Sequence, residues 1–442
     1  MNKEVKVIGA GLAGSEAAWQ LAERGVRVKL FEMRPEKLTP AHKTGNFGEL
    51  VCSNSFKSIE KRKATGILKK EMKLLNSLII DAAEKTKVPA GIALAVDRLL
   101  FSELITEKLN SHPKIEIIRK EIKKIPKNEI VLIATGPLTS DSMEKEISGL
   151  LGQEYLYFYD AASPIIYKES LDMTKLFLAS RYEKGEASYL NASFDEKLYN
   201  DFVKELVNAK TASLHSFEKT IFFEGCMPVE EMAKRGDETL RFGPLKPVGL
   251  RDPKTGKIPY AVVQFRQDNK AKSLFNIVGF QTNLKTGEQK RVFKMIPGME
   301  NAEFARFGMM HRNTYMNSPK HLSFTLNLEK YEDIYFAGQI TGVEGYLECA
   351  VSGIISAVNI CAKTYDKNPV ILPETTVTGA LLNYITSAQQ KNFQPMNVNF
   401  GLLPPLENRL NKKERYIKYG DRALRDLKEF ISEREDIFKD LK

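Results

Sequence analysis

The N-terminal segment carries the clearest pattern of apolar and polar positions in the chain. VKVIGAGLAGSEAAWQLAERGVRVKLFEMRP begins with a continuous apolar run, passes through a glycine-rich turn and continues as an amphipathic stretch that ends at Gly25. This pattern predicts a buried strand, a helix and a second strand that closes on Glu32. Two parallel strands joined by a helix form a βαβ unit.

Two later segments repeat the order of a strand followed by a turn of small residues. NEIVLIATGPLTS predicts a buried strand that runs into a turn at Ala134, Thr135 and Gly136. YEDIYFAGQITGVEGYLECAVSGIISAVNI predicts a strand, a glycine turn and a helix. A strand that returns so late in the chain is typical of flavoproteins, whereas a nicotinamide domain is usually complete early in the chain. We therefore expect an α/β fold with a Rossmann-like, doubly wound FAD-binding domain.

The central part of the chain has a different residue pattern, with polar, strand-like stretches and turns at DPKTGK and NLKTGEQ. The paired segments IPYAVVQFRQ and SLFNIVGFQTN alternate apolar and polar residues, as half-buried antiparallel strands do. We predict an inserted α+β domain over residues 167–298. Residues 1–166 and 299–442 then form a discontinuous FAD-binding domain that ends in one or two basic, amphipathic helices.

The composition is that of a globular protein without a membrane segment. The chain has 442 residues, of which 43% are hydrophobic and 28% charged, and it contains no run of about 18 uncharged apolar residues. We expect a cytoplasmic protein that contacts no membrane. The four cysteines form no CxxC pair and have no His-rich partner spacing, so neither a disulfide framework nor a metal site is predicted. A net charge of +10 favours a polyanionic partner.

The N-terminal glycines match the demands of dinucleotide binding. Gly9 permits a tight turn, Gly11 lets the backbone approach a pyrophosphate and Gly14 lets the helix pack on the strand, while the helix N-terminus offers unpaired N–H groups. Glu32 is placed to accept hydrogen bonds from a ribose. The predicted cofactor-binding residues are Gly9, Ala10, Gly11, Leu12, Ala13, Gly14, Glu32, Gly136, Gly338 and Gln339.

Four longer strings are far more specific than the glycine pattern. They are GAGLAGSEAAWQLAERGVRVKLFEMRP, TPAHKTGNFGELVCSNSFKS, FFEGCMPVEEMAKRGDETLRFGPLKPVGL and YFAGQITGVEGYLECAVSG. Together they resemble the folate- and FAD-dependent tRNA uracil-5-methyltransferase family, TrmFO, over essentially the whole chain. The wider group also resembles GidA, a flavoprotein that acts on the wobble uridine and shares the fold.

The resemblance implies methylation of uridine at C5 in the T-loop of tRNA. FAD would be the cofactor, 5,10-methylenetetrahydrofolate the carbon donor, and NADH or NADPH the reductant. For this reaction C5 must become nucleophilic, and the addition of a thiolate to C6 achieves this by turning the ring into an enolate. A base must then remove the C5 proton. tRNA and folate are therefore the implied partners, and cysteines carry the implied chemistry.

Two cysteines lie in the matching motifs. Cys226, in an expected exposed turn, is the first candidate for the nucleophile that attacks C6. Cys52 follows the dinucleotide unit and is the candidate for the C5 base, although the two cysteines can exchange roles. Cys349 and Cys361 fall at helical spacing in an apolar stretch, so we expect both in the core.

Other polar residues are candidates for substrate binding. His311 can stack on a pterin, with Asn313 nearby. Basic side chains in and near LRFGPLKPVGLRD can hold RNA phosphates or the glutamate tail of folate. These are Arg241, Lys246, Arg251 and Arg266.

Several other functions fit parts of the same sequence. The same chemistry can act on ribosomal RNA, and a GidA-like enzyme would act on the wobble uridine. A flavin disulfide reductase is disfavoured because Cys52 has no neighbouring cysteine. A non-catalytic RNA-binding module would keep its cellular effect without Cys52 and Cys226, so replacing both with alanine separates a binder from an enzyme.

Overall fold

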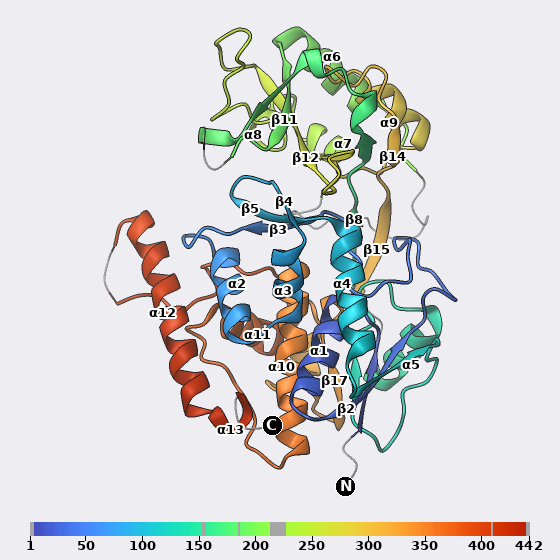
Figure 1. Ribbon diagram of the computed structural model, residues 1–442, viewed down its shortest axis with the longest axis vertical. Helices are drawn as coiled ribbons and strands as arrows, with labels where there is room; N and C mark the ends of the chain where they lie inside the picture. Colours follow the sequence, from blue (N-terminus) through green and yellow to red (C-terminus); the bar gives the residue numbers. More distant parts are fainter. Residues whose placement is uncertain (1–3, 153–155, 184–185, 213–226, 408–409, 439–442) are drawn as a thin grey trace.

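The computed structural model describes residues 4–152, 156–183, 186–212, 227–407 and 410–438. Its described residues form two large hydrophobic cores, each built on its own large sheet, and one small cluster around Val88, Ala90 and Ala95. Figure 1 shows the two parts one above the other along the longest axis. We call them the parallel-sheet domain, which contains both ends of the chain, and the antiparallel-sheet domain.

The parallel-sheet domain is built on six strands. Pairs β1–β2, β1–β7, β2–β6 and β7–β17 are parallel, and only the short edge strand β16 is antiparallel to its neighbour. The central strand β1 has Val5 and Val7 completely buried, as a sheet covered on both faces requires. The strands, in sheet order, are β16 (Asn327–Leu328), β17 (Tyr331–Phe336), β7 (Val131–Ile133), β1 (Glu4–Ile8), β2 (Arg27–Glu32) and β6 (Ile115–Arg119).

Two helices pack closely against each other beside this sheet. They are α1 (Leu12–Glu23), which follows β1, and α10 (Tyr346–Thr364), which follows β17. A Cβ added at Gly353 of α10 would lie 2.3 Å from the carbonyl oxygen of Ala13 in α1, so a glycine is needed at this crossing. Helix α10 is long and apolar enough to cross a membrane, but 83% of its apolar window is buried inside the protein. It is therefore a core helix.

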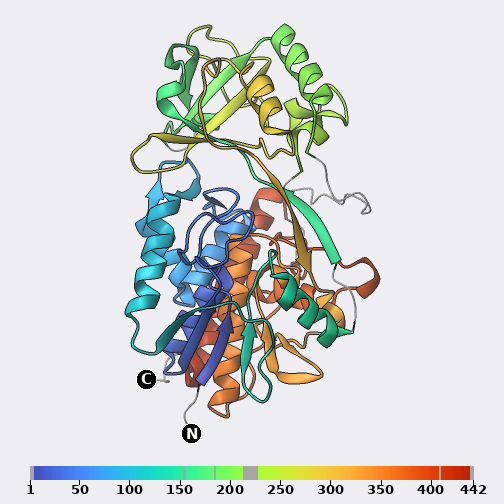
Figure 2. The same cartoon turned by 90° about the vertical axis from the view of Figure 1, so that its right-hand side faces the viewer.

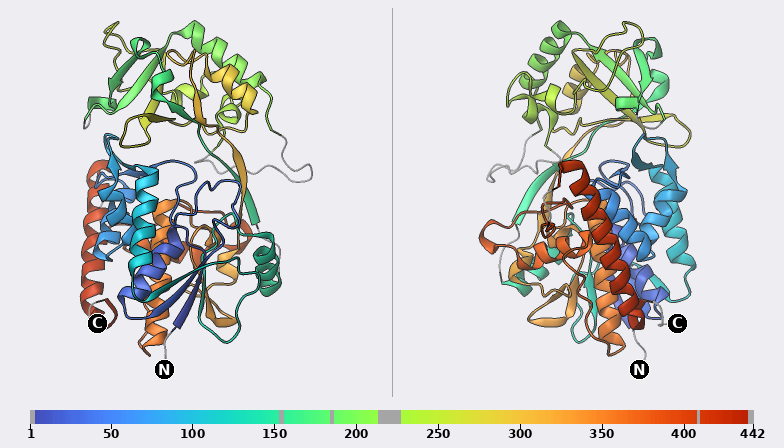
Figure 3. Two further views of the ribbon diagram at one scale, coloured as in Figure 1. Left: turned by 45° about the vertical axis from the view of Figure 1, so that its right-hand side comes forward. Right: turned by 90° about the vertical axis from the view of Figure 1, so that its left-hand side faces the viewer.

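The remaining elements of this domain complete its core. A small sheet lies at the end that faces the other domain and consists of β3 (Ser55–Ser58), β5 (Ala93–Val96) and β4 (Lys87–Val88). Figure 3 shows the C-terminal helix α12 along the outside of the domain. The other helices are α2 (Ala64–Leu74), α3 (Leu78–Lys85), α4 (Arg98–Ser111), α5 (Asp141–Leu151), α11 (Val377–Ser387), α12 (Lys412–Glu433) and α13 (Glu435–Phe438).

The antiparallel-sheet domain has six strands and a separate core. Its strands, in sheet order, are β10 (Leu176–Ala179), β11 (Tyr189–Phe194), β12 (Ala261–Gln267), β13 (Leu274–Ile277), β9 (Ile165–Tyr167) and β14 (Phe304–Arg306). Its helices are α6 (Glu196–Asn208), α7 (Val229–Ala233), α8 (Thr239–Phe242) and α9 (Thr286–Phe293).

The predicted pairing of IPYAVVQFRQ with SLFNIVGFQTN is present as β12 and β13, which are antiparallel. The expectation that they are half-buried is wrong for β12, because every residue of this strand is buried. One face of β12 packs on the domain's own core through Val263 and Phe265. The other face carries polar side chains toward the parallel-sheet domain, where Arg266 donates a hydrogen bond to Asn54.

A two-stranded ribbon joins the domains. Strand β8 (Leu156–Ala161) pairs with β15 (Met310–Tyr315) in antiparallel register, and Figure 2 shows the two strands running between the upper and lower parts. The antiparallel sheet itself reaches from Ile165 to Arg306, slightly beyond the predicted inserted range of 167–298. The exact domain boundaries stay a prediction.

Candidate active site

A cavity of about 1040 Å³ lies at the carboxyl ends of the parallel strands. Residues directly after β1, β2, β7 and β17 all line it, as expected for ligand sites in doubly wound sheets. Gly9 has φ +98°, and a Cβ there would lie 2.5 Å from the carbonyl oxygen of Ala134. A Cβ on Gly14 would lie 1.8 Å from the carbonyl oxygen of Gly9. Both glycines therefore have the tight-turn and packing roles predicted for them.

Two other glycines leave space toward this cavity. A Cβ added at Gly11 or at Gly136 would meet no atom within 4 Å, and both residues line the cavity. Gly11 is the N-cap of α1, where no side chain accepts a hydrogen bond from the first helical N–H groups. This helix end therefore offers free N–H donors and a positive dipole, which fit the pyrophosphate of a dinucleotide.

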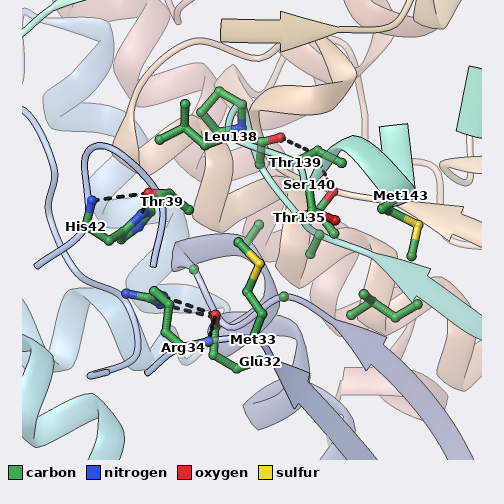
Figure 4. Close-up of a pocket in the computed structure, with 18 of the residues that line it drawn as sticks. Glu32, Met33, Arg34, Thr39, His42, Thr135, Leu138, Thr139, Ser140 and Met143 are labelled. Atoms are coloured by element: carbon green, nitrogen blue, oxygen red, sulfur yellow. Dashed lines mark hydrogen bonds and ion pairs between the residues drawn. The ribbon is translucent and has the colours of Figure 1, made fainter. Parts of the chain in front are cut away.

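Glu32 organises the wall of the cavity at the end of β2. Its carboxylate accepts hydrogen bonds from the backbone N–H of Ala10 at 2.9 Å and from the guanidinium of Arg34 at 3.1 Å (Figure 4). Burial opposes ionisation of Glu32, but the hydrogen bonds and charge of Arg34 outweigh it and lower the Glu32 pKa. The predicted acidic residue is thus an anion held at the cavity, where a ribose hydroxyl can donate to it.

The loop after β2 closes over the same wall. Arg34 also forms an ion pair with Glu49 at 3.1 Å, and the Thr39 hydroxyl lies 2.6 Å from Nδ1 of His42. Burial and the charge of Arg34 lower the His42 pKa to about 4, so this imidazole is neutral at physiological pH. These residues lie in the two N-terminal strings that carry the family resemblance, but the sequence predicted no role for them, because their roles depend on how the loop folds back on Glu32.

A second cavity of about 1150 Å³ adjoins the first. The two share Val51, Pro137, Gln339 and Tyr346 in their linings. Cys52 lines the second cavity directly beside this boundary. Its backbone N–H donates to the Tyr346 hydroxyl at 2.9 Å, and its Sγ lies 3.6 Å from the carbonyl oxygen of Ala161. The predicted catalytic cysteine is therefore placed where the dinucleotide cavity opens into a second binding space.

Polar side chains from both domains meet in the second cavity. Arg266 of β12 is buried and donates to Asn54 and to Ser53, each at 2.8 Å. His311 and Asn313 of β15 line the cavity, as predicted for substrate-binding residues. Nδ1 of His311 and Oδ1 of Asn313 are buried without a hydrogen-bond partner among the described residues. Such groups are costly unless a ligand satisfies them.

The second cavity also holds a buried carboxyl group that sequence reasoning missed. Glu344 accepts a hydrogen bond from Nε2 of Gln339 at 2.5 Å. Burial, reinforced by the negative charge of Asp160, raises the Glu344 pKa well above its usual value. Burial likewise raises the pKa of Tyr346. The cavity therefore places two acidic groups with raised pKa values beside Cys52. No spacing in the sequence marks them, because their raised pKa values come from burial and, for Glu344, from Asp160, which is far away in the sequence.

The structure separates the predicted site residues into groups. Most of the cofactor set lines the first cavity, whereas Ala10 and Gly14 lie directly behind its wall. Cys226 lies outside the described residues. Of the basic candidates in the antiparallel-sheet domain, Arg266 lines the second cavity. The other three line neither cavity: Arg241 stacks on Tyr260 at 3.6 Å, and Lys246 and Arg251 are exposed. The structure does not bring Arg241, Lys246 and Arg251 together with Cys52.

The expectation that Cys349 and Cys361 are both core residues is correct only for Cys361, which is completely buried. Cys349 is half-buried and lines the first cavity, because it lies in the first turn of α10, where the helix end meets the cavity. Burial raises the pKa of its thiol well above the usual value. Within the described residues, no group of three or more His, Cys, Asp or Glu side chains is arranged to hold a metal ion.

Comparisons with known proteins agree with this architecture. The family model for glucose inhibited division protein A (GIDA) matches residues 4–368. Two crystal forms of Aquifex aeolicus GidA align with 98% and 99% of this chain and 76% and 77% of their own, with TM-scores of 0.66 and 0.69 at 17% and 16% identity. The predicted fold class is confirmed: this is a doubly wound dinucleotide-binding protein of the GidA type with a second domain inserted.

Sequence comparison narrows this class to one family. A Ligilactobacillus salivarius protein is 57% identical over 97% of this chain and 99% of its own length, and a Desulforamulus reducens protein is 59% identical over 97% of each. Both are named methylenetetrahydrofolate--tRNA-(uracil-5-)-methyltransferase TrmFO. The chain belongs to the TrmFO family.

Proposed function

We propose that this protein methylates C5 of a uridine in the T-loop of tRNA. It takes the carbon from 5,10-methylenetetrahydrofolate and uses FAD together with NADH or NADPH. The observation that carries the proposal is the position of Cys52 at the junction of a dinucleotide cavity and a second, polar cavity. Membership of the TrmFO family supplies the substrate class, because the relatives are named for this reaction.

The first cavity fits FAD. The space beside Gly11 and Gly136, the free N–H groups of α1 and the Glu32 carboxylate match a pyrophosphate and a ribose. Gln339 lies where the two cavities meet, so it belongs at the end that carries the reactive ring. Bound FAD supplies the two-electron reduction that turns a methylene group into a methyl group, with NADH or NADPH as the source of the electrons.

The cysteines activate the uracil and then release it. We assign to Cys226 the thiolate that adds to C6, which makes C5 nucleophilic, and to Cys52 the base that takes the C5 proton. The activated C5 forms a bond to the one-carbon unit, whose bond to the donor nitrogen breaks. Loss of the C5 proton then restores the C5–C6 double bond and expels the Cys226 thiolate. The same chemistry is possible with the roles exchanged, so that Cys52 adds to C6 and Cys226 takes the C5 proton. Glu344 and Tyr346, whose pKa values are both raised by burial, can in their protonated forms donate hydrogen bonds to the carbonyl oxygens of the activated ring.

The remaining polar groups of the second cavity position the substrates. His311 and Asn313 present unsatisfied polar atoms for the pterin or the uracil. The guanidinium of Arg266 fixes Asn54 and Ser53, so it holds the segment next to Cys52 in place. Arg241, Lys246 and Arg251 remain candidates for more distant RNA contacts. A cytoplasmic location, where tRNA and folate are found, goes with this proposal.

The target nucleotide is tested by mapping the product. An unmodified tRNA transcript is incubated with the protein, the folate donor and NADH or NADPH, and 5-methyluridine is located by nuclease digestion and mass spectrometry. We expect the product in the T-loop, its loss when that uridine is replaced by cytidine, and its loss in Cys226→Ala. Product only in a ribosomal RNA transcript, or only at the wobble position, would contradict the T-loop assignment and favour one of those alternatives.

A further inference from the structure

A groove of about 1360 Å³ lies beyond the second cavity and belongs to neither cavity described above. Its walls come from four places: the segment that leads into α2, the turn between β4 and β5, the start of α12 and the antiparallel sheet around Gln264. Figure 1 shows α12 running up the side of the parallel-sheet domain, with its first turn toward the antiparallel-sheet domain. The groove therefore lies between the two domains, on the side of α12.

The lining of the groove is strongly basic. Five cationic side chains face a single carboxylate, that of Glu60, which is engaged by Arg62 at 2.6 Å. Among the described residues, no carboxylate forms an ion pair with Lys63, Lys412 or Lys413, and all three are exposed. Such a concentration of unneutralised cations attracts a polyanion. The five cations are Arg62, Lys63, Arg181, Lys412 and Lys413.

Aromatic rings are interleaved with these charges. Tyr182 is 57% exposed and has a positive φ of 59°, an unusual backbone conformation for a tyrosine that sets its ring against Gly249. Tyr416 lies in the same lining, with Nζ of Lys412 6.0 Å from its ring centre. Cations that follow a backbone and rings that stack on bases are the combination that binds single-stranded RNA.

The groove leads to the catalytic cavity along shared elements. Gln264 lines the groove and Arg266 lines the second cavity, and these residues lie on the same face of β12, about 7 Å apart along the strand. The turn after β13 also contributes to both spaces: Val278 lines the groove and Gln281 lines the second cavity. An RNA strand that occupies the groove can thus place its next nucleotide beside Cys52.

We infer that this groove is a docking site for the ribose-phosphate backbone of the tRNA strand that carries the target uridine. Lys412, Lys413 and Lys63 contact phosphates, and Tyr182 stacks on a base or ribose next to the target. The inference rests on the proposed function, because that function makes a tRNA the macromolecule that must reach Cys52.

The test measures the affinity for an unmodified tRNA transcript as a function of salt concentration. The variant Lys412→Ala/Lys413→Ala should raise the dissociation constant about five- to tenfold near 0.1 M salt. It should also reduce the slope of log K against log salt by about 1.5, because two phosphate contacts are lost. Tyr182→Ala should weaken binding about fivefold or more, whereas Tyr182→Phe retains the affinity because the ring is kept.

A matched control removes the same charge from the same helix. Arg425 and Lys428 are exposed and lie more than three turns of α12 away from Lys413, so Arg425→Ala/Lys428→Ala should leave affinity and salt slope unchanged. Bound flavin and circular dichroism show whether each variant is folded. Wild-type affinity and slope in Lys412→Ala/Lys413→Ala would overturn the inference and leave the groove to another partner. A wild-type protein that binds tRNA through the groove but methylates no uridine would contradict the proposed function instead.

Discussion

At the scale of single residues, buried charge is the feature that sets the chemistry of this protein. The charge and hydrogen bonds of Arg34 lower the pKa of Glu32, whereas burial and the nearby charge of Asp160 raise the pKa of Glu344. Both carboxyl groups are buried, so it is their neighbours that decide which one ionises. One is thereby suited to accept hydrogen bonds from a ribose, and the other to donate a hydrogen bond to a substrate.

Glu71 provides a test of this principle away from the active site. It is completely buried, and its carboxyl group accepts hydrogen bonds from the backbone N–H groups of Val377 and Thr378 at the start of α11. Burial outweighs these hydrogen bonds and raises the Glu71 pKa to about 7. In the unfolded chain the pKa is about 4.3.

The sign of the pH effect follows from this difference. Between about pH 4 and pH 7 the folded protein holds a proton on Glu71 that the unfolded chain has lost, so stability falls as the pH rises through this window. We expect Glu71→Gln to lack this contribution, which amounts to at most about 4 kcal/mol. Urea unfolding of both proteins between pH 5 and pH 8 measures the difference. Parallel stability curves for the two proteins would show that Glu71 ionises normally in the fold.

At the scale of elements, the close contact of α1 with α10 sets the position of the dinucleotide cavity. The N-terminus of α1 points its free N–H groups into that cavity, and Gly353 lets α10 approach the same turn of α1. The approach fixes Ala13, which itself lines the cavity. Packing between two helices that are far apart in sequence therefore shapes the cofactor site.

Gly353→Ala should destabilise the protein by about 1–3 kcal/mol, because the new Cβ would lie 2.3 Å from the carbonyl oxygen of Ala13. We also expect weaker retention of FAD. Gly149 is the matched control: it is exposed in α5, and a Cβ there would meet no atom. Gly149→Ala should stabilise the protein by up to about 1 kcal/mol through helix propensity. Denaturant unfolding measures the free energy of unfolding of both variants and of the wild type. A Gly353→Ala protein as stable as the wild type would refute the packing argument.

At the scale of the whole molecule, the active-site cavity is completed by both domains. Arg98 of α4 forms a buried ion pair with Asp268, just after β12, at 2.9 Å, and Arg266 of β12 holds Asn54. These contacts flank the loop that carries Cys52. The inserted domain therefore fixes the loop that carries Cys52, and the ribbon of β8 and β15 brings His311 and Asn313 to the same cavity.

These relationships explain what the sequence could predict. The βαβ unit, Glu32 and the late strand before Gly338 follow from local apolar patterns and turn glycines, which depend on short stretches of chain. Cys52, His311 and Asn313 were found through the family resemblance. Glu344 and Arg34 escaped prediction because their chemistry arises from burial and from partners distant in space, which periodicity does not record.

The most direct test of the account is the transfer of isotopically labelled carbon from 5,10-methylenetetrahydrofolate to tRNA by wild type, Cys52→Ala and Cys361→Ala. We predict that Cys52→Ala retains its flavin but loses at least about a hundredfold in transfer rate, because the base at C5 is gone. Cys361, buried in the core, serves as the control, and its alanine variant should stay within about twofold of the wild type. A Cys52→Ala protein that transfers label at the wild-type rate would contradict the assignment of the junction of the two cavities as the active site.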